Sequence, residues 1–152
     1  MYEKILVPVD GSETAALGLN EAIKLASHQG GKIRLVHIVN ELIVVSQYAS
    51  AATLGQLIDF LRSSGESILG DAKTVAGRAG VEVDTLLVEA MGGQAGEHIV
   101  QQAEKWGADL IVCGTHGRRG IRRLVMGSDA EYIVRNTPVP VLLVRSREPV
   151  SK

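Results

Sequence analysis

The stretch DLIVCGTHGRRGIRRLVMGSDAE, residues 109–131, contains a strand, a loop and the start of a helix in that order. Its first residues, Asp109–Cys113, form a short apolar run of the kind found in strands that are buried on both faces of a sheet. A loop with four glycines and four arginines follows, and Ser128-Asp129-Ala130-Glu131 has the spacing of a capping box at a helix start. This order is the repeating unit of a parallel α/β sheet.

The same alternation extends along the rest of the chain. Further apolar runs have the length of strands, at residues 5–9, 33–39, 81–88 and 139–144. Apolar residues at helical spacing separate them, within residues 15–26, 54–76 and 99–106 and in a short segment after Ser128. We therefore predict an α/β fold with a doubly wound, five-stranded parallel sheet. The whole chain, residues 1–152, is expected to form a single domain, with 146–152 as a loose tail.

The composition limits the classes of partner. A net charge of −1 and a pI near 6.4 argue against a general nucleic-acid-binding protein, because such proteins usually carry a basic excess. Cys113 is the only cysteine, so an internal disulfide is impossible, which suits a reducing cytoplasm. No apolar stretch approaches the ~20 residues that span a bilayer. We predict a soluble, cytoplasmic protein with no nucleic-acid partner and no membrane partner.

The loop between Gly114 and Gly127 has the chemistry of a phosphate site. In an open parallel sheet, ligands bind beyond the carboxyl ends of the strands, where this loop and Asp10-Gly11-Ser12 both begin. Glycines let backbone N–H groups approach a ligand, a helix start at Ser128 favours an anion, and the arginines add positive charge. Two simpler interpretations stay open: Ser128 only caps its helix, and the arginines form only a solvated surface. The loop has neither the P-loop ending nor the G-x-G-x-x-G fingerprint.

Several motifs in order resemble one family. The spacing Gly114-x2-Gly117-x9-Gly127-Ser128 resembles the G-x2-G-x9-G-[S/T] signature of ATP-binding universal stress proteins. Four segments resemble strands of that family, two of them with the turn or loop that follows: Ile5–Ser12, Leu35–Ile38, Asp109–Gly117 and Pro138–Val144. The resemblance implies the adenine-nucleotide alpha-hydrolase-like fold, with strand order 3-2-1-4-5. It also implies an ATP molecule that lies across the first and fourth strands.

The resemblance assigns residues to the nucleoside. Pro8, Val9 and Asp10 would border it, and the Asp10 carboxylate would accept a hydrogen bond from a ribose hydroxyl. Ile38 would meet the adenine edge through its backbone, and Gly114 would lie beside the ribose. From its place between a strand and a helix, Asp10 also suits a helix N-cap, and one carboxylate can serve both roles.

The resemblance also assigns residues to the phosphates. Gly117, Gly127 and Ser128 would hold them, with Mg²⁺ or Mn²⁺ as a bridging ion. His116 and Arg118 lie in the same loop and complete this group as candidates for contact with the nucleotide.

Asp129 is a candidate that departs from the family pattern, in which an apolar residue often follows the Gly-Ser pair. A carboxylate in the first turn suits the helix dipole, but it would repel phosphates unless a divalent ion lay between. Asp129 and His116 are the only nearby groups that could assist hydrolysis, and neither is a compelling base. We therefore expect a regulatory ATP-binding module without catalytic residues and with at most slow hydrolysis. The alternatives are a nucleotide-free dimeric interaction module of the same fold and, ranked lower, an ATP-using transferase or pyrophosphatase.

The last apolar run has the features of an edge strand. Pro138 and Pro140 have no N–H group to donate to a ladder, and Val141–Val144 is entirely apolar. A bare apolar edge favours pairing with a second chain. We predict a homodimer through Val139–Val144, and the family resemblance implies the same.

Overall fold

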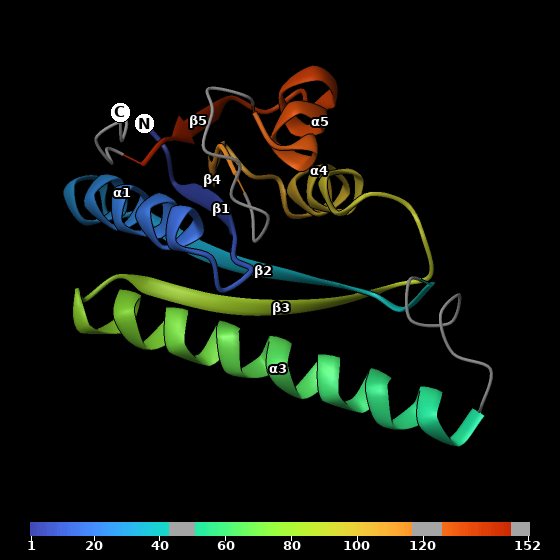
Figure 1. Cartoon of the computed structure of the whole chain (residues 1–152). Coiled ribbons are helices and arrows are strands. Elements are labelled where there is room, and N and C mark those ends of the chain that lie inside the picture. Colours follow the sequence, from blue (N-terminus) through green and yellow to red (C-terminus); the bar gives the residue numbers. More distant parts are fainter. Residues whose placement is uncertain (43–50, 117–125, 147–152) are drawn as a thin grey trace, which may run out of the picture.

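The computed structural model describes residues 1–42, 51–116 and 126–146. In chain order, the elements are β1 (Lys4–Pro8), α1 (Glu13–Gln29), β2 (Lys32–Asn40), α3 (Ala51–Arg78), β3 (Glu82–Ala90), α4 (Ala95–Trp106), β4 (Leu110–Gly114), α5 (Ser128–Asn136) and β5 (Val141–Val144). The strands form one five-stranded parallel sheet in the order β3-β2-β1-β4-β5, with helices on both faces (Figure 1). The predicted fold class and strand order are therefore confirmed.

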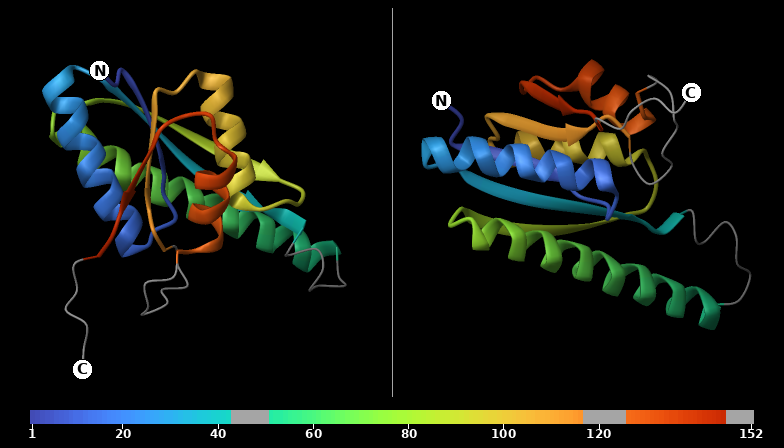
Figure 2. Two further views of the ribbon diagram at one scale, coloured as in Figure 1. Left: turned by 90° about the horizontal axis from the view of Figure 1, so that it is seen from above. Right: turned by 60° about the vertical axis from the view of Figure 1, so that its left-hand side comes forward.

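The strands β1 and β4 are buried on both faces of the sheet, as their apolar runs predict, whereas the edge strands β3 and β5 are partly exposed. Alternate residues along β1 enter different cores: Ile5, Val7 and, directly after the strand, Val9 pack on the side of α1 and α3, and Leu6 packs on the side of α4 and α5. Figure 2 shows these helix layers from two further directions. Because β1 lies in the middle of the sheet, its carboxyl end is surrounded by other elements.

Helix α3 is continuous over Ala51–Arg78 although it contains four glycines, which individually disfavour a helix. One of them, Gly65, is buried where the helix closes on β2 and β3, and an added Cβ there would lie 2.6 Å from Cδ2 of His37. Gly55, Gly70 and Gly77 have no atom within 4 Å of such a Cβ. Close packing thus requires glycine at one of these four positions.

The two edges of the sheet differ in chemistry. Strand β3 carries acidic side chains. One of them, Asp84, forms a bidentate salt bridge with Arg34 on β2, at 2.7 Å to Nε and 3.0 Å to Nη2. Strand β5 is short and has no charged residue. It begins at Val141 rather than at the predicted Val139, since Pro138 and Pro140 cannot donate ladder hydrogen bonds.

Candidate functional site

The pairing of β1 with β4 ends earlier along β1 than its pairing with β2. The β1–β4 ladder contains only the pairs Ile5↔Leu110 and Leu6↔Ile111, whereas the β1–β2 ladder continues to Pro8. Continuing the first register would place Pro8 opposite Cys113, and proline has no N–H group to donate to that strand. The strand order also reverses at β1, so this is the position where ligands bind in open parallel sheets.

The first segment at this position is the turn from β1 into α1. Gly11 has a positive φ of 82°, and the Ser12 N–H group donates to Oδ1 of Asp10 at 2.9 Å. The cap of α1 is Ser12, whose hydroxyl oxygen accepts from the Ala15 N–H group at 3.2 Å. The simpler interpretation of Asp10 as the N-cap is therefore wrong. A carboxylate can accept several hydrogen bonds, so the turn is compatible with a further bond to a ribose hydroxyl.

The second segment is the end of β4, which is hydrogen-bonded to α1. The Thr14 hydroxyl donates to the backbone carbonyl of His116. A Cβ at Gly114 would lie 2.9 Å from the backbone and side chain of Thr14, so glycine is needed for this approach. The two segments that the sequence assigned to the nucleoside and the ribose are thus brought together.

Thr115 connects the end of β4 to two other segments and also contacts its neighbour His116. It is the only buried polar or charged residue in the described ranges, with 7% of its surface exposed. Its N–H group donates to the Val144 carbonyl at 3.0 Å, and its carbonyl accepts from the Gly127 N–H group at 2.6 Å. Its hydroxyl lies 3.0 Å from Nδ1 of His116. The first and last described residues of the loop are therefore joined at Thr115.

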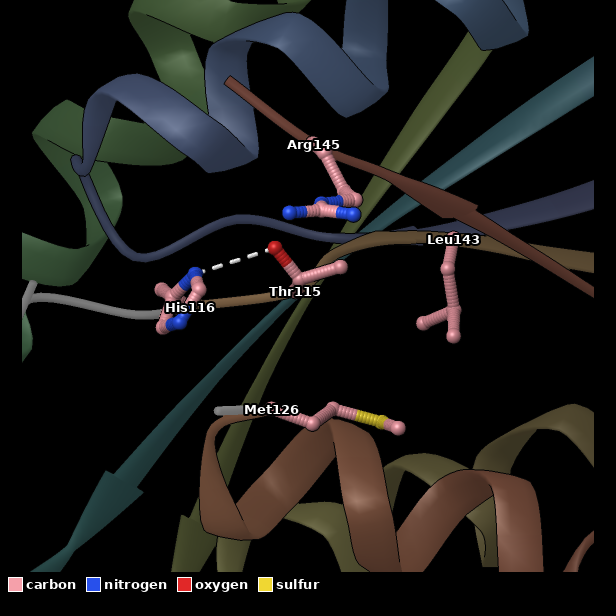
Figure 3. Close-up of a pocket in the computed structure, with 5 residues that line it drawn as sticks. All are labelled: Thr115, His116, Met126, Leu143 and Arg145. Carbon is pink, nitrogen blue, oxygen red and sulfur yellow. Dashed lines mark hydrogen bonds between the residues drawn. The ribbon is translucent and has the colours of Figure 1, made fainter. Parts of the chain in front are cut away.

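A small pocket of about 200 Å³ lies beside Thr115. Its lining residues are Thr115, His116, Met126, Leu143 and Arg145. Figure 3 shows Met126 facing Thr115 and Leu143 across the hollow, with the Arg145 guanidinium beside Thr115. Nε2 of His116 is buried and has no hydrogen-bond partner within the described residues. No local pattern in the sequence marks Arg145, because only the sheet order places the end of β5 next to the end of β4.

The start of α5 differs from the capping-box interpretation. The N-cap is Gly127, its carbonyl accepts from the Glu131 N–H group at 2.9 Å, and no side chain caps the helix. Ser128 is the first helical residue and is exposed. The proposal that Ser128 only caps its helix is therefore wrong, and its hydroxyl lies at a helix N-terminus.

Asp129 faces α4. Its Oδ1 accepts from the Gly96 N–H group at 2.9 Å, and a Cβ at Gly96 would lie 2.8 Å from the Asp129 carbonyl oxygen. Gln94, the N-cap of α4, makes no side-chain cap bond, so Asp129 supplies an acceptor for that helix start. The carboxylate has a structural partner that the sequence pattern did not indicate.

The remaining candidate residues make no hydrogen bond described above or lie outside the described ranges. Ile38 is partly buried on β2, next to β1, and Gly117 and Arg118 lie outside the described residues. Burial raises the pKa of the Cys113 thiol to about 12, so this cysteine is not an activated nucleophile. No cluster of three or more His, Cys, Asp or Glu side chains within residues 1–42, 51–116 and 126–146 could hold a metal ion. No described helix is both long and apolar enough to cross a membrane.

Comparisons with known proteins agree on one family. Residues 1–145 match the model of the universal stress protein family, Usp. Universal stress protein MJ0531 of Methanocaldococcus jannaschii is 32% identical over 148 residues, which cover 95% of this chain and 83% of that protein. The solved structure of hypothetical protein MJ0577 has a TM-score of 0.86 and 26% identity, covering 98% of this chain and 99% of that one.

Structures of the same fold contain adenine nucleotides. The universal stress protein from Archaeoglobus fulgidus in complex with dAMP has a TM-score of 0.70 and 23% identity, covering 94% of this chain and 98% of that one. An Arabidopsis thaliana family protein with AMP and a universal stress protein with cAMP are 18% and 22% identical. At these identities the likeness establishes the fold.

Proposed function

Because the chain belongs to the universal stress protein family, we propose that it binds ATP across the carboxyl ends of β1 and β4 and acts as a regulatory module. The observation that carries the proposal is the convergence of three features at one edge: the β1–α1 turn, the end of β4 and the exposed N-terminus of α5. This arrangement offers an acceptor for a ribose and a helix start for phosphates. Complexes of the same fold with adenine nucleotides support an adenine nucleotide as the ligand.

The nucleoside end is proposed to use the segment Pro8-Val9-Asp10, the backbone of Ile38 and the close approach at Gly114. The phosphate end is proposed to use His116, Gly117, Arg118, Gly127, Ser128 and Asp129. The Gly127 N–H group already donates to Thr115, so the N–H groups of α5 after Gly127 are better placed to face a phosphate. Since Asp129 is bonded to Gly96, it contributes by holding α5 in position.

A divalent ion, Mg²⁺ or Mn²⁺, is proposed to accompany the triphosphate and neutralise its charge. No group of three or more His, Cys, Asp or Glu side chains in the described ranges could hold such an ion, so phosphate oxygens and water would supply most of its ligands. We propose that hydrolysis is at most slow. Nδ1 of His116 lies 3.0 Å from the Thr115 hydroxyl and its Nε2 is buried, while Asp129 accepts from the Gly96 N–H group of α4, so neither group is proposed to orient an attacking water.

Calorimetric titration of the purified chain, stripped of nucleotide, tests the proposal. Mg·ATP should bind with micromolar affinity, GTP should bind at least tenfold more weakly, and absence of binding at millimolar ATP would refute the function. Asp10→Asn keeps an acceptor for the Ser12 turn but loses the charged acceptor for the ribose. Its affinity should fall about tenfold or more, since a hydrogen bond to a charged group contributes roughly 1.5–3 kcal/mol. Glu21→Gln, on the exposed surface of α1, is the matched control.

We further propose that the protein is a homodimer joined through β5. Since Pro140 and Val144 direct their carbonyls to β4, the backbone groups of Val141 and Leu143 point to the open edge. Leu142→Lys, at a position 37% exposed, places a charge on this edge and should yield monomers in light scattering. Val134→Lys, on the exposed face of α5, should leave the dimer intact. A monomeric parent protein would refute the interface. The cytoplasmic location stays a prediction.

A further inference from the structure

The imidazole of His37 forms a contact that the proposed function does not yet include. His37 lies on β2, and its Nδ1 is 2.7 Å from the backbone carbonyl oxygen of Val9. A carbonyl only accepts hydrogen bonds, so Nδ1 carries a proton and donates it. Val9 is the last buried residue before the β1–α1 turn. The imidazole thus binds the segment that is proposed to border the nucleoside.

This hydrogen bond stands where a ladder bond would otherwise form. The Val9 N–H group donates to the Val36 carbonyl at 2.9 Å, and the β1–β2 register aligns Val9 with His37. In a regular parallel ladder, the Val9 carbonyl would next accept from the Ile38 N–H group. Within the described residues no backbone hydrogen bond joins Ile38 to Val9, and the imidazole occupies the carbonyl instead.

The backbone groups of Ile38 consequently face the β1 side of β2, beyond the end of the β1–β2 ladder. Successive residues of a strand direct their backbone groups to opposite neighbours. Because the Val36 carbonyl points toward β1, the N–H and C=O groups of Ile38 point to the same side, just beyond the last ladder bond. One residue thus presents a donor and an acceptor together. The Watson–Crick edge of adenine, with an acceptor ring nitrogen beside a donor amino group, complements this pair.

Helix α3 fixes the ring in this position. A Cβ at Gly65 would lie 2.6 Å from Cδ2 and 3.2 Å from Nε2 of His37, and 2.8 Å from Cδ1 of Leu87. The backbone of α3 therefore lies directly against the imidazole. The ring is held between this helix and the Val9 carbonyl.

We infer that His37 is a positioning residue for the base: by occupying the Val9 carbonyl, its imidazole keeps the Ile38 backbone pair available for an adenine. The inference rests on the proposed nucleotide function. It also makes a separate structural claim about the Ile38 amide that holds without any ligand. The imidazole itself does not contact the nucleotide in this scheme.

The test compares the parent protein with His37→Phe and His37→Asn. The Phe ring keeps the packing against Gly65 but removes the donor, whereas an Asn amide retains an N–H group near the position of Nδ1. In the ligand-free protein, hydrogen exchange of the Ile38 amide should be at least tenfold faster than that of Val36. His37→Phe should slow it, because the amide then pairs with the Val9 carbonyl, and should weaken ATP binding about tenfold more than GTP binding. His37→Asn should retain most of both parental properties.

The two hypotheses fail differently. If the parent binds no adenine nucleotide, the proposed function is refuted, and the exchange rates still decide the role of His37. If the parent's Ile38 amide exchanges as slowly as that of Val36, or if His37→Phe keeps the parent's affinity and adenine preference, the inference is overturned. Should His37→Phe fail to fold, Gly65→Ala displaces the ring without removing it, and the same exchange and selectivity shifts are expected. Gly70→Ala, which meets no neighbour, is its control.

Discussion

Gly65 and Gly70 lie on the same helix, α3, but in opposite surroundings, and this difference gives a sharp test of the packing. Alanine is about 1 kcal/mol more favourable than glycine in a helix interior. At Gly70 an added Cβ meets no atom within 4 Å. Gly70→Ala should therefore raise the free energy of unfolding by about 0.5–1 kcal/mol.

At Gly65 the same gain is opposed by two close contacts. The new Cβ would lie 2.6 Å from a ring atom of His37 and 2.8 Å from a methyl group of Leu87. Overpacking of this kind costs about 1–3 kcal/mol. The ring can retreat only by losing its bond to the Val9 carbonyl, which contributes about 1 kcal/mol more. Gly65→Ala should therefore lower the free energy of unfolding by about 1–3 kcal/mol.

Urea denaturation followed by circular dichroism measures both variants, and equal m-values would show that the comparison concerns the folded state. A double-mutant cycle with His37→Ala isolates the ring: without it, Gly65→Ala should be less destabilising by about 1 kcal/mol or more. If Gly65→Ala stabilises the protein as Gly70→Ala does, α3 does not pack on His37 as described.

Three further predictions concern other contacts. Asp129→Ala should lower the free energy of unfolding by about 1 kcal/mol, because the Gly96 N–H group loses its acceptor, whereas Asp129→Asn should retain most of that stability; equal losses in urea denaturation would contradict the hydrogen bond. Cys113, with its pKa raised to about 12 by burial, should react with iodoacetamide at pH 8 at least about a hundredfold more slowly in the folded protein than in urea, and equal rates would show that the thiol is accessible. Arg34 holds the pKa of Asp84 below its ordinary value of 3.8, so the contact stabilises the fold above that pH and the stabilisation is lost as the pH falls through the lowered pKa. Asp84→Asn should therefore cost up to about 1 kcal/mol at pH 7, for a pair that is partly screened by solvent, and progressively less below pH 4; a pH-independent difference would contradict this role.

The fold was predictable because its signals are local. Each strand includes a short apolar segment, and the helices α1 and α4 end at Gly30 and Gly107, which adopt the left-handed conformation with φ values of 70° and 71°. Alternation of such runs with helical periods leaves few topologies. The strand order itself came from the resemblance to a family, because spacing along the chain does not determine which strands are neighbours.

The contacts inside the site were not predictable in the same way. His37 and Val9 are 28 residues apart, and Thr14 and His116 are 102 apart. Their pairing depends on how β1, β2 and β4 are aligned, and no local pattern encodes that alignment. The sequence could place candidate residues at one edge of the sheet, but it could not indicate that an imidazole takes the acceptor of a ladder amide.

The start of α5 shows how a tertiary contact overrides a local signal. The sequence Ser128-Asp129-Ala130-Glu131 matches a capping box with Ser128 as the cap. In the folded chain, the Gly127 N–H group is bonded to the Thr115 carbonyl at 2.6 Å, which fixes Gly127 at the end of β4 and makes it the cap. The helix therefore begins one residue earlier than the pattern implies. As a result the Ser128 hydroxyl does not cap its own helix, and it stands exposed at the N-terminus where a phosphate is proposed to bind.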